Sequence, residues 1–301
     1  MNLDLTKCNC TGAGFCEIYD KEMDAAGVNW CKNTTKEKRE NYCELNNPKQ
    51  KKLIDSLSQL NVICLGHCRD QFKSINKKQY LTFQYLQDLD LKKFSKFQTN
   101  QYAETRAYLA DIFDYEKYNY IGVVTASWNI KYNNKNKIDE LEKWLNFNYL
   151  DRKNTVICAT TASTISWIEG SDSVMKWLGT PKKHINEIIK FHEKLGMKIN
   201  SKEVANHNQI ICHKDLFKDI QDYFKENIFE YSKLFDGFNL SEFSEFARSR
   251  LFAFYCEFSS MMFLSNNLTH SLSMQKCNAQ EWFQPSEVKK RNDGIYNKNI
   301  K

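Results

Sequence analysis

The sequence predicts an α/β protein in which a mostly parallel sheet is flanked by helices. Four short runs are continuously apolar rather than alternating, which is typical of strands covered on both faces. Segments with helical periodicity lie between these runs, and such alternation favours a sheet with right-handed crossovers. The expected strands are residues 61–65, 120–125, 155–159 and 209–212. The expected helices are residues 100–113, 138–146, 182–195, 214–229 and 241–264.

The chain is expected to have three parts. Cysteines and glycines crowd the first 45 residues, and a Pro-Lys-Gln-Lys-Lys segment that follows resembles a connector. We therefore expect a small cysteine-rich module over residues 1–47 and the α/β domain over residues 48–265. Residues 266–301 are polar and are expected to form an irregular tail.

Composition limits the classes of function. The 301 residues are 42% hydrophobic and 14% aromatic, which is typical of a globular protein. The excess of basic residues, 43 − 37 = +6, is scattered along the chain and does not favour a nucleic-acid binder. The amino terminus lacks the apolar stretch of a signal peptide, and residues 251–264 are too short to span a bilayer. We therefore expect a soluble protein in the cytoplasm of a bacterial or virus-infected cell.

The amino-terminal cysteines are candidate metal ligands. Thiolates are preferred ligands of Zn²⁺, and a small module without a core of its own gains stability from a metal. Three of these cysteines would bind with one of two others as the fourth ligand. The candidates are Cys10, Cys16 and Cys31, with Cys8 or Cys43. Their spacing differs from paired C-x-x-C knuckles, so a metal-free reduced extension and an iron–sulfur cluster remain alternatives.

The end of the first expected strand is a candidate ligand site. Gly66 would allow close backbone approach, and His67 and Arg69 could meet a phosphate or a base. Ligands of open α/β sheets bind outside the carboxyl ends of strands. A hydrogen-bonded structural role for His67 is the alternative.

The segment around the second expected strand supplies further candidates. Glu104 and Arg106 lie two positions apart in the expected helix, so they would project to nearly opposite sides. One would then be a site residue and the other an exposed or helix-pairing charge. After the strand, Thr125 and Ser127 offer hydroxyls and Trp128 an aromatic plane, with a structural plug as the alternative for the tryptophan.

A residue near the fourth expected strand completes the set. Asn208 stands at the entry to that strand and could hydrogen-bond sugar hydroxyls, or it could be a turn residue.

Three segments, residues 100–128, 208–224 and 246–255, resemble the glycosyltransferase-like family of capsular-polysaccharide clusters, which has a GT-A-type fold. The matching residues are Glu104-Thr105, Tyr120-Ile121-Gly122 and Arg250-Leu251-Phe252, and an asparagine-containing strand lies between the last two. Where that family has a His-Tyr-Arg-Arg motif, this chain has Thr125-Ala126-Ser127-Trp128, and Ser249 replaces the family's glutamate. No convincing Asp-x-Asp metal motif is present. The cysteine-rich extension resembles that of some phage and marine-bacterial proteins of this kind.

The resemblance implies a glycosyltransferase that moves a sugar from a nucleotide-sugar donor to an acceptor, with Mg²⁺ or Mn²⁺ as a possible cofactor. In that interpretation Arg69 and Arg106 stabilise charge, Gly66 and His67 form the donor loop, and Glu104 is a base or a sugar contact. The alternative is a non-catalytic viral or host-interaction protein that retains the fold. A zinc-dependent nucleic-acid adaptor is a second alternative.

Overall fold

A computed structural model describes the chain from residue 55 to residue 273, with gaps. The described residues are 55–73, 75–126, 138, 141, 145, 147–158, 160–169, 173–243, 248, 250–267 and 270–273. The chain divides into two compact units, Met1–Gln59 and Leu60–Lys301. The predicted cysteine-rich module and its boundary after residue 47 lie outside the described residues and stay predictions.

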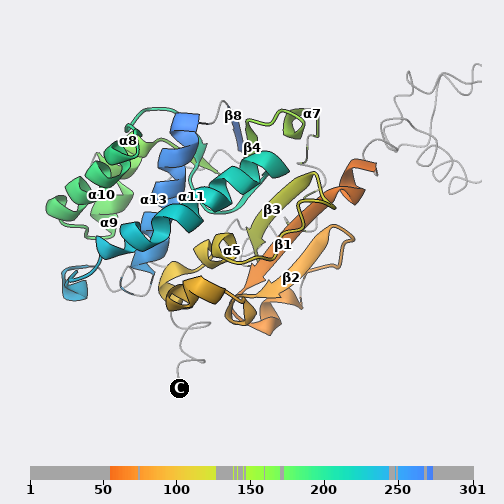
Figure 1. The fold of residues 1–301 in the computed structure, drawn as a ribbon, viewed down its shortest axis with the longest axis horizontal. Helices are drawn as coiled ribbons and strands as arrows, with labels where there is room; N and C mark the ends of the chain where they lie inside the picture. The colour runs from red at the N-terminus through yellow and green to blue at the C-terminus, as the bar shows by residue number, and fades with distance from the viewer. Residues whose placement is uncertain are drawn as a thin grey trace, which may run out of the picture. The chain divides into compact units, whose positions relative to one another are not determined.

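The second unit is built on a six-stranded sheet in the order β2-β1-β3-β7-β4-β8 (Figure 1). Five strands run in one direction, and β7 is antiparallel to both of its neighbours, β3 and β4. The strands are β1 (Leu60–Gly66), β2 (Leu81–Tyr85), β3 (Tyr120–Thr125), β4 (Thr155–Cys158), β7 (Ile210–His213) and β8 (His270–Ser273). The prediction of a mostly parallel sheet flanked by helices is confirmed, and it is consistent with the glycosyltransferase-like fold that the resemblance implies.

The strand pairing aligns the strand ends at one edge of the sheet. Gly66 is paired with Tyr85, and the preceding residue, Leu65, is paired with Thr125. On the other side of β3, Ile210 at the start of β7 is paired with Cys158 at the end of β4. We call this edge, where β1 to β4 end and β7 begins, the carboxyl edge.

Two of the six strands are missing from the sequence prediction. β2 and β8 lie at the two outer positions of the sheet, where a strand needs no continuous apolar run. The last four residues of β2 are exposed or only partly buried. β8 falls within the segment that was expected to be an irregular tail, so that expectation is wrong for His270–Ser273 and for Asn266 and Asn267, which end α13. A separate two-stranded sheet pairs β5 (Thr161–Ala162) with β6 (Val204–Ala205).

The helices between the strands come in two groups. Before β4 lie η2 (Arg69–Phe72), η3 (Leu86–Asp88), η4 (Lys92–Phe97), η5 (Asn100–Tyr102), α5 (Thr105–Leu109) and α7 (Phe147–Leu150). After β4 lie α8 (Thr164–Ile168), α9 (Val174–Trp177), α10 (Lys182–Lys194), α11 (Lys214–Lys233), η7 (Leu240–Glu242) and α13 (Leu251–Asn267). No helix in the described part of the chain is long and apolar enough to cross a membrane.

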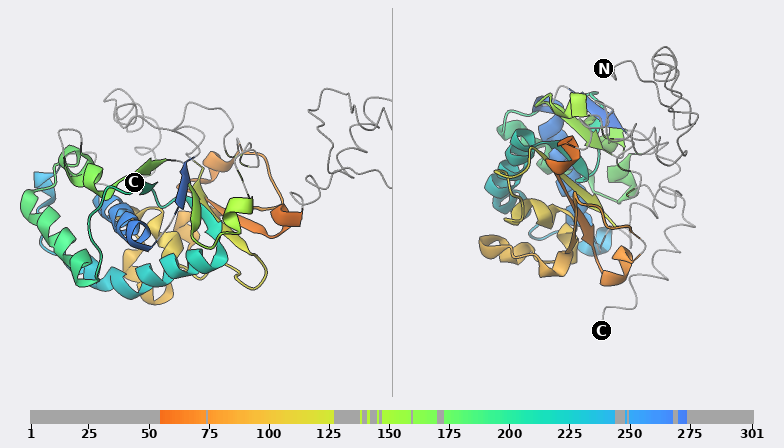
Figure 2. Two further views of the ribbon diagram at one scale, coloured as in Figure 1. Left: turned by 90° about the horizontal axis from the view of Figure 1, so that it is seen from above. Right: turned by 90° about the vertical axis from the view of Figure 1, so that its right-hand side faces the viewer.

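Helices α11 and α13 carry most of the helical core. α11 has an apolar stripe that packs on β3, β7 and α5, and the right-hand view of Figure 2 shows α11 (teal) and the segment containing α5 on one side of the sheet. α13 is buried nearly all round, as expected for a helix that is apolar on every face. Its contacts with α5, α8 and η5 make it the centre of the helical layer.

The predicted helix over residues 100–113 is much shorter in the structure. η5 ends at Tyr102, the backbone at Ala103 has a φ of +40°, and α5 begins only at Thr105. A non-glycine residue in the left-handed region interrupts a helix, because its Cβ crowds the following carbonyl. Glu104 occupies the N-cap position of α5 with helical φ and ψ and makes no side-chain cap hydrogen bond, so Glu104 and Arg106 still project as in a helix.

A buried histidine joins α10, α11 and α13. His192 is fully buried, and its Nδ1 lies 2.8 Å from the Ile188 carbonyl oxygen. Its Nε2 lies 3.0 Å from Ser259 Oγ, which is 2.7 Å from the Tyr223 hydroxyl. A neutral ring that donates through Nδ1 and accepts at Nε2 satisfies all three side chains. Burial lowers the pKa of His192 to about 4.

We predict that acid weakens folding through His192. Between about pH 6.5 and pH 4 the unfolded chain binds a proton that the folded state refuses, so stability is lost as the pH falls across that window. The loss should reach roughly 3 kcal/mol. Urea unfolding from pH 7.5 to pH 4 should show a steeper decline for the natural protein than for His192→Gln, which cannot ionise. Equal slopes would contradict the prediction.

Candidate active site at the carboxyl edge

The carboxyl edge brings together polar residues from distant parts of the chain. Asn208, two residues before β7, donates from Nδ2 to Thr105 Oγ1 at 3.0 Å, and its carbonyl accepts from the Tyr108 hydroxyl at 3.0 Å. At the end of β3, Thr125 donates to Gln209 Oε1 at 3.3 Å. All of these residues are buried. The hydrogen bonds tie α5 to the start of β7, which places α5 at the carboxyl edge.

Glu104 and Arg250 form a buried ion pair beside these hydrogen bonds. Arg250 Nη2 lies 3.0 Å from Glu104 Oε2, and the two side chains are 15% and 4% exposed. The partners are 146 residues apart in sequence, so the pair joins the start of α5 to the segment that leads into α13. Little solvent reaches the pair, so breaking it would leave an uncompensated charge inside the protein.

Arg106 is buried at the same edge. Its side chain has no solvent exposure, and its Nε donates to the Ala103 carbonyl at 3.0 Å. Of the two alternatives for the second charge, exposure does not apply because both side chains are buried, whereas pairing does, since Glu104 pairs with Arg250. Burial lowers the pKa of Arg106 to about 10, and the nearby Glu104 carboxylate opposes that shift. The guanidinium therefore stays charged at neutral pH.

The residues after β1 are also at the carboxyl edge. The backbone N–H of His67 donates to Gln71 Oε1 at 2.7 Å, and Arg69 begins η2. A Cβ added to Gly66 would lie 2.5 Å from Cζ of Phe72, so this glycine is required by the approach of an aromatic ring. The predicted donor loop thus has a packing reason for its glycine as well as the proposed ligand role.

The other sequence candidates lie outside the described residues. These are Ser127, Trp128 and the five cysteines Cys8, Cys10, Cys16, Cys31 and Cys43. Their proposed roles stay predictions. Of the remaining candidates, Gly66, His67, Glu104, Arg106, Thr125 and Asn208 come together at or next to the carboxyl edge.

Two further ionisable residues near this edge, His207 and Arg250, were not chosen from the sequence. Nδ1 of His207, next to Asn208, lies 3.4 Å from Glu257 Oε2 of α13. Arg250, the partner of Glu104, is the second of these residues. The sequence does contain a sign of each pair: Glu257 interrupts an apolar run, and Arg250 belongs to a segment that carries the family resemblance. An ionisable residue in a buried run usually has a partner.

The divalent metal that the resemblance implies stays a prediction. Within the described ranges, no group of three or more histidine, cysteine, aspartate or glutamate side chains could hold a metal ion. Asp90, in the nearest approach to an Asp-x-Asp pattern, instead accepts the backbone N–H of Lys92 at 3.0 Å. We therefore derive no chemical step through a metal.

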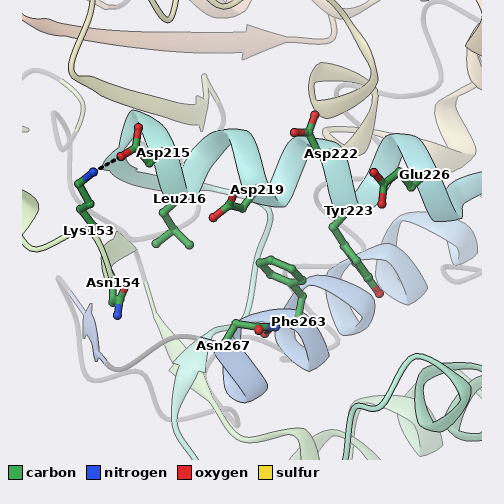
Figure 3. A pocket seen from close by; sticks show the side chains of 10 residues that line it. All are labelled: Lys153, Asn154, Asp215, Leu216, Asp219, Asp222, Tyr223, Glu226, Phe263 and Asn267. Atoms are coloured by element: carbon green, nitrogen blue, oxygen red, sulfur yellow. Dashed lines mark hydrogen bonds and ion pairs between the residues drawn. The ribbon is translucent and has the colours of Figure 1, made fainter.

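A hollow at the opposite edge of the sheet is a competing location. This acidic groove has a volume of about 550 Å³ (Figure 3). It is lined by Lys153, Asn154, Asp215, Leu216, Asp219, Asp222, Tyr223, Glu226, Phe263 and Asn267. Lys153 pairs with Asp215, while burial and the two neighbouring aspartates raise the pKa of Asp219. The field of these carboxylates would repel a nucleotide, so the groove does not fit an anionic donor.

We predict that the Glu104–Arg250 pair is a major contributor to stability. Glu104→Gln should lower the free energy of unfolding by about 3 kcal/mol, because it leaves Arg250 without its paired charge. Arg250→Met should be similarly costly, and the double variant should be less destabilised than the sum of the two. Denaturant titrations would measure this coupling.

The exposed pair of Lys233 with Glu230 provides a control for this prediction. These side chains are 61% and 65% exposed, so Glu230→Gln should change stability little. Additive losses at Glu104 and Arg250 would show that the buried pair is not coupled.

Comparisons with known proteins find little similarity. No protein-family model and no curated protein matches the sequence. A solved structure described as the apo form of WbbM, a bifunctional glycosyltransferase, has a TM-score of 0.46 and 8% identity to this chain. The match covers 72% of this chain and 45% of that one, so the chain spans less than half the length of that protein. A likeness this distant identifies no activity, and function must be inferred from the side chains at the carboxyl edge.

Proposed function

We propose that this protein transfers a sugar from a nucleotide-sugar donor to an acceptor, with the donor bound at the carboxyl edge. One observation carries the proposal. The three segments that resemble the glycosyltransferase-like family, which are far apart in sequence, meet at this edge through Glu104–Arg250 and Thr105–Asn208. Ligands of open α/β sheets bind at such an edge.

The charges at this edge suit the chemistry. Transfer breaks the bond between the anomeric carbon and the diphosphate oxygen and forms a bond from that carbon to the acceptor oxygen, and the proton of the acceptor hydroxyl passes to the released nucleoside diphosphate. Negative charge grows on the departing diphosphate, and fixed cations in a desolvated site stabilise it. Arg106 and Arg250 supply two such cations among the described residues.

Glu104 fits one of its two proposed roles better than the other. Its carboxylate is neutralised by Arg250 at 3.0 Å, which opposes the uptake of a proton from an acceptor hydroxyl. An ionised carboxylate accepts several hydrogen bonds, so a contact with sugar hydroxyls remains compatible with the pair. We therefore assign Glu104 to sugar binding and to the positioning of Arg250.

The same observation supports a second candidate function. If Glu104 does not act as a base, the fold could bind a nucleotide-sugar or a related ligand without turnover, as a non-catalytic viral or host-interaction protein would. Ser249, at the position where the family has a glutamate, favours this alternative. Binding and turnover must therefore be measured separately.

We predict that one nucleotide-sugar in a panel of UDP- and GDP-sugars raises the melting temperature. At a concentration about 100-fold above the dissociation constant, the rise should be about 5 °C or more. Thermal shift assays with and without Mg²⁺ or Mn²⁺ would measure binding, and release of the nucleoside diphosphate would measure turnover. A shift without turnover would favour the binding protein.

A variant of the acidic groove serves as the control. Asp219→Asn changes the opposite edge of the sheet, so it should keep the full thermal shift. If no member of the panel shifts the melting temperature, the proposed function fails. If Asp219→Asn abolishes the shift, the ligand binds in the groove and the carboxyl edge is the wrong site.

A further inference from the structure

The guanidinium of Arg106 is an interior cation whose donors the described residues do not satisfy. Its side chain is 0% exposed. Both terminal nitrogens, Nη1 and Nη2, are buried and have no hydrogen-bond partner among the described residues. Within that part of the chain only Nε is bonded, to the carbonyl oxygen of Ala103 at 3.0 Å. Buried arginine nitrogens are normally paired, because each unpaired donor carries its full cost of desolvation.

The local backbone holds this guanidinium in a fixed orientation. The Ala103 carbonyl accepts from the backbone N–H of Arg106 at 3.3 Å as well as from its Nε. Ala103 itself is fully buried and has a φ of +40°, a strained value for a residue with a Cβ. Because Nε is held, the plane of the group is set, and the two terminal nitrogens form a fork of fixed direction.

The described charges around Arg106 leave its two terminal nitrogens without an anionic partner. The Glu104 carboxylate acts electrostatically on Arg106, but its Oε2 is bonded to Arg250. Of these three ionised groups, two are positive and one is negative. At the same edge Asn208 Oδ1 is also buried without a described partner, and as an acceptor it would be satisfied by a protonated oxygen of a phosphate and not by an ionised one. Flipping the Asn208 amide would not satisfy this position, because the NH₂ group would then be buried there without a partner in place of the oxygen.

We propose that the fork of Arg106 binds an oxyanion of the phosphate class, held by two parallel N–H···O bonds from Nη1 and Nη2. A planar fork of this kind matches two oxygens of a phosphate, and such charge-assisted pairs are strong where water is excluded. The position at the carboxyl edge, beside the Glu104–Arg250 pair, is where the proposed donor carries its diphosphate. The inference rests on the proposed function only in one respect, that the phosphate belongs to a nucleotide-sugar.

Two alternative roles for the fork give different experimental results. A buried water could bridge the fork to Asn208, in which case no anion would be taken up. The guanidinium could also be a purely structural partner of Glu104, in which case its removal would weaken folding without any dependence on anions. Under either alternative, phosphate acts equally on the natural protein and on a variant without the fork.

The test compares phosphate with chloride at matched ionic strength in the full-length protein. Arg106→Met removes the fork and keeps an apolar side chain, and Arg106→Lys keeps the charge without the fork. Arg152→Met is the matched control, because Arg152 is exposed and lies in the turn before β4 at the opposite edge. Titration calorimetry with inorganic phosphate and pyrophosphate gives dissociation constants, and thermal melting gives the stabilisation.

The expected result is that phosphate binds the natural protein and Arg152→Met equally. In Arg106→Met the dissociation constant should rise at least about 10-fold, and in Arg106→Lys it should rise by a smaller factor. If Arg106→Met does not fold, the comparison of Arg106→Lys with the natural protein decides. No phosphate binding by the natural protein, or equal binding by the Arg106 variants, would overturn the proposal.

The two proposals can fail separately. Binding of phosphate that depends on Arg106, with no response to any nucleotide-sugar, would keep the oxyanion site and reject the sugar donor. A nucleotide-sugar that binds equally to the natural protein and to Arg106→Lys, without phosphate binding, would keep the donor and reject the role of Arg106.

Discussion

The arrangement of the carboxyl edge depends on the buried ion pair between Glu104 and Arg250. The two charges compensate each other in a place that is largely shielded from water. The pair therefore requires that the start of α5 and the segment before α13 stay together, although 146 residues separate them. Thr105 and Asn208 add a neutral hydrogen bond between α5 and the start of β7. These contacts leave α5 with no freedom to move away from the strand ends.

The sheet could be predicted from the sequence only where strands are covered on both faces. All seven residues of β1 and all six of β3 are buried, and both strands appear in the sequence as continuous apolar runs. β2 and β8 occupy the outer positions of the sheet, and their sequences LTFQY and HSLS carry polar side chains among apolar ones. A rule based on continuous apolar runs selects the centre of a parallel sheet and misses its borders.

The same limit applies to the site. Strand ends locate the edge without any tertiary information, which is why Gly66, Thr125 and Asn208 could be chosen from the sequence. Pairing between distant charges cannot be seen in that way, so Arg250 and the contact of His207 with Glu257 became visible only in the structure. The predicted extent of the helix around Glu104 and Arg106 was wrong for a local reason. The prediction assumed a continuous helix from residue 100, whereas the backbone at Ala103 has a positive φ and α5 begins after it.

At the two edges of the sheet, an open groove and an unpaired buried polar group point to different ligand sites. The acidic groove is open, yet its lysine–aspartate pair and its hydrogen-bonded tyrosine are already satisfied within the protein. The described polar side chains at the carboxyl edge are buried, yet they include a charged guanidinium with two nitrogens that no described residue satisfies. Such a group lowers stability, and the buried contacts of His192, Tyr223 and Ser259 among the helices help to offset that loss. A fold that keeps an unsatisfied cation in its interior points to a ligand more directly than an open surface does, because a hollow costs little and an unpaired buried charge costs much.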